Sequence, residues 1–199
     1  MVKPIRSLFK YIVRCVYPYF LDEMKSREES QLHHLKSSGD FISLGNGTIL
    51  GGAAYITLGT CCRFGRGCRI EAISKYHNQQ FSPNLVLGNH VTMEDWGHIG
   101  CINNVEIGEG TMIASRVFIT DHFHGEISSE NLNNRPALRP LTSKPVKIGR
   151  NVWIGEGASI MPGVTIGDNV IIGANAVVTH SFPKNVVIAG CPATIIKEL

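Results

Sequence analysis

The C-terminal part of the chain repeats an apolar residue every six positions without a slip. These anchors are Ile148, Ile154, Ile160, Ile166, Ile172 and Val178. A second small apolar residue precedes each anchor by two positions, at Val146, Val152, Ala158, Val164, Val170 and Ala176. Gly or Asn follows the first five anchors by three positions, at Asn151, Gly157, Gly163, Asn169 and Asn175. Because Gly, and after it Asn, best tolerates the positive φ of a tight left-handed turn, each repeat is predicted to be a short strand followed by a corner.

This period excludes the two common alternatives. An amphipathic helix needs apolar residues about 3.6 positions apart, and a Gly or Asn at every sixth position would cost up to about 1 kcal/mol each. An antiparallel meander has longer strands, with turn signals about every 8–12 residues. The regular six-residue corners therefore predict an all-β solenoid, in which the chain coils in one direction.

The same period extends toward the N-terminus with two kinds of irregularity. Eight-residue steps replace six-residue steps between Leu50 and Leu58 and between Ile99 and Ile107. The period disappears at about 71–83 and 121–145, where Pro, Asn and charged residues collect. In a solenoid such segments are loops that leave one side of the coil, and they are often functional. We therefore predict a coil domain over 41–199 with two extruded loops and a short C-terminal extension.

Composition agrees with one globular domain and an appendage. The 199 residues carry a net charge of +3, which gives no electrostatic case for nucleic-acid binding. The six cysteines form no CxxC pair and have no metal-ligand spacing, which favours reduced thiols and a cytoplasmic protein. These cysteines are Cys15, Cys61, Cys62, Cys68, Cys101 and Cys191.

Residues 1–40 are predicted to form a separate helical segment. Lys3, Arg6, Lys10 and Arg14 would share one face of a helix that ends near Pro18, and a second, polar helix would follow over Asp22 to Leu35. The first helix is too short to span a bilayer. It either packs on protein or lays its basic face on the inner surface of the membrane.

The run from Val146 to Lys197 resembles the left-handed parallel β-helix acetyltransferases with hexapeptide repeats. Its closing AGCPA segment makes the resemblance more specific, and the similarity extends over about Leu44 to Leu199. It is greatest to maltose, galactoside and polysaccharide O-acetyltransferases, including enzymes that modify O-antigen and capsule. The resemblance implies a left-handed coil, a homotrimer with active sites at subunit interfaces, acetyl-CoA as co-substrate, and no metal.

Acyl transfer from a thioester to a hydroxyl needs a base, which near neutral pH is most often His. The pair His122 and His124 stands where the longer loop leaves the coil. The family places its catalytic His five residues after the equivalent anchor, which corresponds to His124 here. His122 is the alternative base, and Asp121 is either its orienting carboxylate or an ordinary loop residue.

The resemblance also implies an acceptor site. Glu94 falls where the galactoside enzyme has an acceptor-binding Asn, and this departure leaves the acceptor's identity open. Asn103 and Asn104 are expected one coil below His124, with amides available for sugar hydroxyls. Trp96 either stacks on a sugar ring or packs at a corner, and His98 is either structural or close to the acceptor.

Coenzyme A contacts are carried over residue by residue. Trp153 matches a family Trp that lines the active site from the adjacent subunit, against either the acceptor or the pantetheine arm. The other matched positions are Gly155, Ala174, Thr179 and Lys197, whereas His180 replaces a family Lys and Glu156 a small polar residue.

The expected function is acetyl-CoA-dependent O-acetylation of a carbohydrate hydroxyl in surface polysaccharide biosynthesis, by direct transfer in a ternary complex. One alternative is an N-acetyltransferase that acts on an amino sugar nucleotide or another small acceptor. Two others share the coil: a γ-type carbonic anhydrase, which needs three zinc-binding histidines, and a non-catalytic scaffold.

Overall fold

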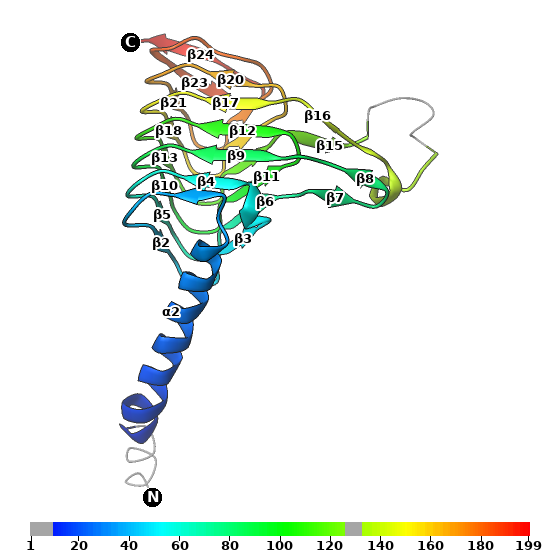
Figure 1. Cartoon of the computed structure of the whole chain (residues 1–199). Coiled ribbons are helices and arrows are strands. Elements are labelled where there is room, and N and C mark those ends of the chain that lie inside the picture. The colour runs from blue at the N-terminus through cyan, green and yellow to red at the C-terminus, as the bar shows by residue number, and fades with distance from the viewer. Residues whose placement is uncertain (1–9, 126–132) are drawn as a thin grey trace, which may run out of the picture. The chain divides into compact units, whose positions relative to one another are not determined.

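The computed structural model describes residues 10–125 and 133–199. The chain divides between His34 and Leu35 into two compact units, and each is described by itself (Figure 1).

The first unit is helical from residue 10 to His33. A π-helical turn, η1 (Ile12–Val16), leads directly into α2 (Tyr17–His33). The expected helix end near Pro18 is wrong, because the helix continues through this proline. Pro18 cannot donate a backbone hydrogen bond, and its ring opposes the carbonyl four residues earlier. The N–H of Tyr17 bonds to Ile12 five residues back, so a π turn shifts the hydrogen-bond register just before the proline.

The polar helix expected over Asp22 to Leu35 is confirmed as part of α2, which buries none of its residues and ends at His33, two residues earlier than predicted. Lys3 and Arg6, half of the expected basic face, lie outside the described residues. No helix within residues 10–125 or 133–199 is long and apolar enough to cross a membrane.

The second unit is a coil built from three sheets, which we call A, B and C in the order in which the chain first enters them. Sheet A contains β1 (Ser37–Ser38), β4 (Ile56–Leu58), β9 (Asn84–Leu87), β12 (Asn104–Ile107), β17 (Val146–Ile148) and β20 (Thr165–Ile166). Sheet B contains β2 (Ser43–Leu44), β5 (Arg63–Phe64), β10 (Thr92–Met93), β13 (Met112–Ile113), β18 (Trp153–Ile154), β21 (Ile171–Ile172), β23 (Val186–Gly190) and β24 (Ala193–Glu198). Sheet C contains β3 (Ile49–Gly51), β6 (Arg69–Ala72), β11 (His98–Cys101), β14 (Phe118–Thr120), β19 (Ser159–Ile160) and β22 (Val177–Val178).

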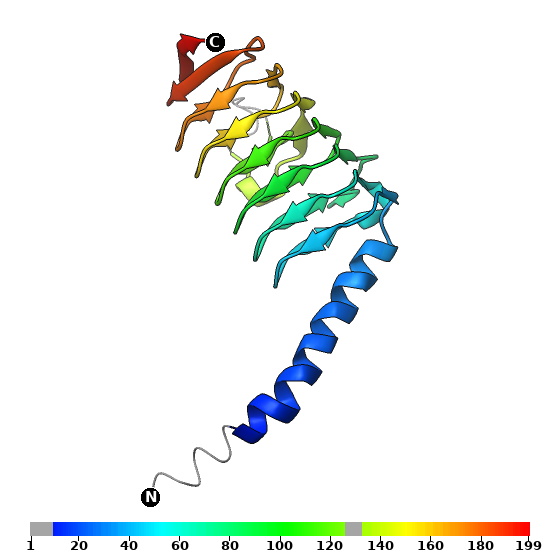
Figure 2. The ribbon, with the colours of Figure 1, turned by 90° about the vertical axis from the view of Figure 1, so that its left-hand side faces the viewer.

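Neighbouring strands in these sheets run parallel, except in the terminal β23–β24 pair (Figure 2). The chain passes from A to B to C and back to A, so each circuit adds one strand to each sheet. We name the corners between successive sheets AB, BC and CA. The predicted mostly parallel, repeating architecture is confirmed.

The six-residue period sets the inside and the corners of the coil. All six anchors from Ile148 to Val178 are buried, as are the small apolar residues two positions before them. Each buried Ile contributes about 1.5–3 kcal/mol by leaving water. The predicted left-handed corners are also confirmed, with φ of 53° at Asn151, 70° at Gly157 and 57° at Asn175.

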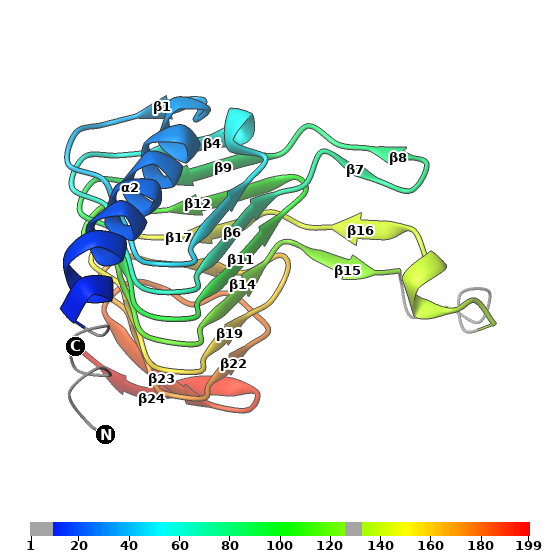
Figure 3. The same ribbon diagram turned by 90° about the horizontal axis from the view of Figure 1, so that it is seen from below.

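Both predicted interruptions are hairpins that leave the coil at corner CA (Figure 3). The first is β7 (Lys75–Tyr76) paired with β8 (Gln79–Gln80). The second pairs β15 (His122–His124) with β16 (Leu141–Ser143). Two 3₁₀ turns also occur, η2 (Ala53–Tyr55) at corner CA and η3 (Pro136–Leu138) in the second loop.

Two corner glycines test how far side-chain stacking stabilises the coil. Gly47→Ala and Gly67→Ala would each put a Cβ on a residue with positive φ, at a cost of about 1–2 kcal/mol. The nearest atom to the new Cβ is 3.9 Å away at Gly47, whereas at Gly67 it would overlap the ring of Trp96. We expect Gly67→Ala to lower the melting temperature more than Gly47→Ala and to shift the tryptophan fluorescence. Equal melting temperatures with unchanged emission would contradict this packing.

Candidate active site

The carboxylate of Asp121 is fully buried where the longer loop leaves the coil. It accepts hydrogen bonds from three consecutive backbone N–H groups, those of Ile102 (3.0 Å to Oδ1), Asn103 (2.7 Å to Oδ2) and Asn104 (2.9 Å to Oδ2). These donors lie in the eight-residue step of the period, from the end of β11 to the first residue of β12. The irregular step therefore supplies the N–H groups that hold the loop carboxylate.

His122 completes this arrangement. Its Nδ1 lies 2.9 Å from Oδ1 of Asp121 and 3.1 Å from Oγ1 of Thr120, and its side chain is only 13% exposed. Because a carboxylate only accepts, Nδ1 carries the proton and Nε2 keeps its lone pair. Burial raises the pKa of Asp121, but hydrogen bonds from His122 and from the N–H groups of Ile102 and Asn103 outweigh it and hold that pKa below its ordinary value.

His124 has different surroundings. Its ring is exposed and meets Tyr76 edge-on, with ring centroids 5.5 Å apart. The hydroxyl of Tyr76 donates to the carbonyl oxygen of Ala137 at 2.6 Å, so at 3.3 Å it accepts from Nδ1 of His124. Nε2 of His124 is thus also left unprotonated, but its partner is a neutral hydroxyl.

The two hairpins at corner CA are tied together. Gln79 acts as a strand partner for Leu141, because its Oε1 accepts from the Leu141 N–H at 2.7 Å and its Nε2 donates to the Leu141 carbonyl at 3.1 Å. His77 Nε2 also lies 2.8 Å from the carbonyl oxygen of Ala137. The shorter hairpin therefore supports the loop that carries His122 and His124.

The two predicted amide residues lie at the same corner. Asn103 is exposed, and its Nδ2 donates to Oγ of Ser143 at 3.3 Å. Asn104 is engaged on both sides: its Oδ1 accepts from Asn84 at 2.8 Å and its Nδ2 donates to Glu106 at 3.1 Å. Of this pair, Asn103 is therefore the more accessible to a ligand.

Two other residues that were predicted to bind the acceptor substrate lie elsewhere in the coil. Glu94 and Trp96 are at corner BC, at the opposite end of the sheet C strands from His124. Glu94 contacts Arg63 at 3.5 Å, and the Trp96 ring covers Gly67 while staying 60% exposed. A single chain therefore does not bring Glu94 and Trp96 to His124.

The residues predicted to bind coenzyme A are likewise divided between different parts of the coil. Trp153 projects from sheet B and is 49% exposed, and Gly155 and Ala174 follow at corner BC. A Cβ on Gly155 would lie 2.6 Å from the backbone nitrogen of Ala174, so the coils approach closely there. The remaining three stand apart from these, with Thr179 and His180 just after β22 at corner CA and Lys197 in β24.

His98 acquires partners that the sequence did not indicate. Its Nε2 lies 3.1 Å from Oε2 of Glu71, which also accepts from Arg69 at 2.6 Å. Burial, and then the positive charge of Arg69, lower the pKa of His98. Aligning the repeats would have placed Arg69 beside His98 and Glu71 beside Gly100, which is the only sequence signal for this cluster.

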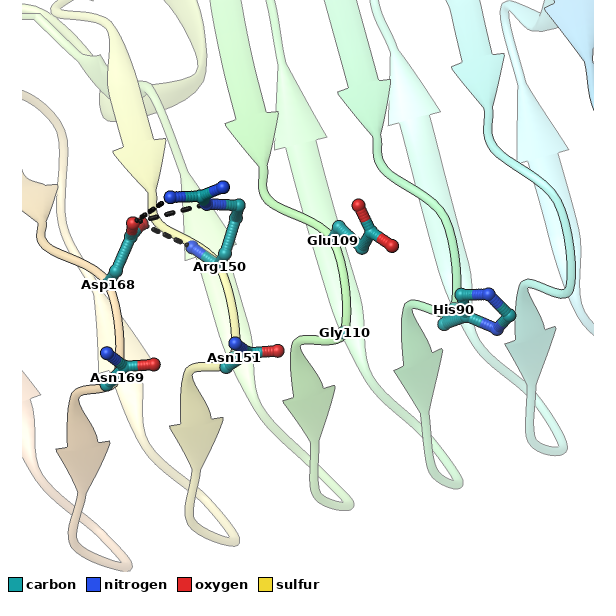
Figure 4. Close-up of a pocket in the computed structure, with 7 residues that line it drawn as sticks. All are labelled: His90, Glu109, Gly110, Arg150, Asn151, Asp168 and Asn169. Carbon is teal, nitrogen blue, oxygen red and sulfur yellow. Dashed lines mark hydrogen bonds and ion pairs between the residues drawn. The ribbon is translucent and has the colours of Figure 1, made fainter.

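A shallow pocket at corner AB contains none of the predicted site residues. It follows the stacked left-handed turns at His90, Asn151 and Asn169, and an ion pair of 2.8 Å between Arg150 and Asp168 lines it (Figure 4). Beside this ion pair, the side chain of Asn169 donates to Oδ1 of Asn185 at 2.9 Å, so several of the polar groups at this corner bond to the neighbouring circuit.

No group of three or more His, Cys, Asp or Glu side chains in residues 10–125 and 133–199 is arranged to hold a metal ion. A zinc centre of the carbonic anhydrase kind would therefore need ligands from beyond the described part of one chain.

The family described as bacterial transferase hexapeptide (six repeats) matches residues 145–180. WbbJ of Escherichia coli (strain K12), a protein assigned to lipopolysaccharide biosynthesis as an O-acetyl transferase, is 42% identical over 140 residues, 67% of each chain.

Two solved structures resemble this chain in fold. A galactoside acetyltransferase in complex with coenzyme A is 28% identical, with a TM-score of 0.53 over 88% of this chain and 71% of that one. AntD, an N-acyltransferase from Bacillus cereus in complex with dTDP and 3-hydroxybutyryl-CoA, has a TM-score of 0.69 at 19% identity, over 86% of this chain and 87% of that one, and shows likeness of fold.

The contacts of Asp121 generate a prediction about stability. Asp121→Asn would turn an amide NH₂ toward backbone donors, and we expect it to lower the free energy of unfolding at pH 7 by about 1–3 kcal/mol. Because the folded pKa of Asp121 is depressed, its contribution is present above the unfolded pKa of about 3.9 and is lost as the pH falls through the folded value.

Urea unfolding of both proteins at several pH values measures this. The wild type should lose more stability than Asp121→Asn as the pH falls below about 4. Asp168→Asn, which removes a more exposed carboxylate bonded to Arg150, is the matched control and should cost less at pH 7. Equal losses for the two variants would contradict the role assigned to Asp121.

Proposed function

The chain belongs to the bacterial hexapeptide-repeat transferase family and is an acyltransferase, and from that premise we propose that it transfers an acetyl group from acetyl-CoA to a carbohydrate hydroxyl. The observation that carries the proposal is the Asp121–His122 pair at corner CA. The similarity to WbbJ supports an acceptor that belongs to a surface polysaccharide such as O-antigen, capsule or exopolysaccharide.

In the proposed mechanism His122 is the general base. Its Nε2 removes the proton from the sugar hydroxyl as the oxygen attacks the thioester carbonyl of acetyl-CoA. A backbone N–H of the coil holds the oxyanion of the tetrahedral intermediate. Collapse of the intermediate forms the ester and breaks the carbon–sulfur bond, and the thiolate takes the proton back from the imidazolium. Transfer is direct, with no acetyl-enzyme intermediate.

Contact chemistry favours His122 over His124, the base that spacing indicates. An imidazole that gains a proton becomes a cation, which a neighbouring carboxylate stabilises much more than a hydroxyl does. His122 has Asp121 at 2.9 Å, whereas His124 has Tyr76 at 3.3 Å. We assign His124, with exposed Asn103, to acceptor binding beside the base.

The division of site residues between two corners supports a homotrimer with shared sites. Corner CA of one copy would supply His122, Thr179 and His180, and a neighbouring copy would supply Trp153 from sheet B with Gly155, Ala174, Glu94 and Trp96 from corner BC. Lys197 would contact the nucleotide end of coenzyme A. We also infer that the coil is left-handed, as in the family.

We place the reaction in the cytoplasm, where acetyl-CoA is available. The helical unit exposes Tyr11, Tyr19 and Phe20 together with the basic residues Lys10 and Arg14. These side chains suit contact with the anionic inner surface of the membrane.

Substitution of the two histidines tests the base. Acetyl transfer from labelled acetyl-CoA should fall by about 10²–10⁴ in His122→Ala, the contribution typical of a general base. His124→Ala should mainly raise the KM for the acceptor. Sugar and amino sugar acceptors assayed side by side separate O- from N-acetylation. Full activity of His122→Ala with loss in His124→Ala would transfer the role of base to His124.

Mixed oligomers test whether copies share a site. His122→Ala and Trp153→Ala alter residues that the proposal draws from different copies. Each variant alone should be weakly active, and co-expression should restore activity well above the sum of the two. A mixture of His122→Ala with His124→Ala, both at corner CA, should not gain in this way. No gain in the first mixture would contradict sites shared between copies.

A further inference from the structure

The outer face of sheet C beside His122 carries a second imidazole–carboxylate pair. Parallel pairing places Arg69, His98 and Phe118 in one row across β6, β11 and β14. The next outward-facing row contains Glu71, Gly100 and Thr120. Across β6, β11 and β14, Gly100 is therefore the one position in these two rows without a side chain.

Gly100 is buried beside two histidines, His122 and His98. A Cβ built on Gly100 would lie 3.1 Å from Cε1 of His122, 3.7 Å from Oγ1 of Thr120 and 3.8 Å from Nε2 of His98. Glycine in the interior of a strand weakens the strand and often marks the close approach of a ligand. A side chain at this position would crowd the His122 ring, so glycine lets that ring pack close to sheet C beside His98.

One carboxylate oxygen of Glu71 receives no hydrogen bond from the described residues. Its Oε2 accepts from both Arg69 and His98, and within residues 10–125 and 133–199 its Oε1 has no hydrogen-bond partner. The side chains of His98 and Glu71 are 32% and 25% exposed, so the pair is partly shielded from water and still open to a ligand. Carboxylates in such positions accept hydrogen bonds from hydroxyl groups.

We propose that the outer face of sheet C between His122 and the Glu71–His98 pair is an acceptor subsite for a sugar with two adjacent free hydroxyls. One hydroxyl meets Nε2 of His122 and is acetylated, while its neighbour donates to Oε1 of Glu71. His98 and Arg69 hold the carboxylate in place, and Gly100 lets the His122 ring pack close to this face. This inference rests on the proposed function, because it locates the second hydroxyl relative to the base.

A cycle of enzyme variants and deoxy sugars tests the subsite. The probes are methyl hexopyranosides, each paired with the monodeoxy sugar that lacks the hydroxyl next to the acetylated one. For the wild type, removing that hydroxyl should raise the acceptor KM about tenfold to a hundredfold. Glu71→Gln should raise the KM for the intact sugar by a similar factor, and the deoxy sugar should then lose little more. The KM for acetyl-CoA should not change.

Three further measurements keep the test decisive. Gly100→Ala should displace the His122 ring and lower kcat, while the KM for acetyl-CoA stays unchanged. Glu109→Gln, at exposed corner AB, is the matched control and should behave as the wild type. A merely structural Glu71 would lower the melting temperature in Glu71→Gln and leave discrimination against the deoxy sugar intact, which would overturn the inference. If the wild type acetylates none of the sugars, the proposed function itself fails.

Discussion

The hydrogen bonds of one buried carboxylate, Asp121, connect the coil, the long loop and the imidazole of His122. Three consecutive backbone N–H groups from the preceding circuit satisfy the charge, and the imidazole accounts for a further bond. Each hydrogen bond to a charged group contributes about 1.5–3 kcal/mol, which offsets the cost of burying the charge. The donors exist because the six-residue period is broken by two extra residues at this circuit. The irregular step in the repeat thus supplies the backbone N–H groups that hold Asp121 and, through Asp121, the ring of His122.

Much of the coil could be predicted from the sequence because its rules are local. An anchor every sixth residue and a positive φ at Asn151 or Gly157 require knowledge of only a few neighbours. The continuation of the helix through Pro18 could not be read in this way, since it depends on a π turn that absorbs the proline. The choice between His122 and His124 also depends on distant partners, among them Tyr76, which lies 48 positions from His124 along the chain.

The register of the repeats determines which residues of one chain can lie in the same site. Residues that occupy equivalent positions in successive circuits lie on one corner, so Trp153 and Glu94 are far from His122 within one chain, however well each matches the family. A matching position in the repeat does not indicate which corner of the coil a residue occupies. By the same logic, Arg69 with His98 and Glu71 with Gly100 become neighbours through register alone. The outer face of sheet C then adjoins the base, and this is where an acceptor is expected to bind.

A crystal structure of the protein with coenzyme A tests the central claim most directly. The account predicts that the thiol lies beside Nε2 of His122 at corner CA, with Trp153 of a neighbouring copy along the pantetheine arm. A thiol at corner AB, or beside a histidine other than His122, would contradict it.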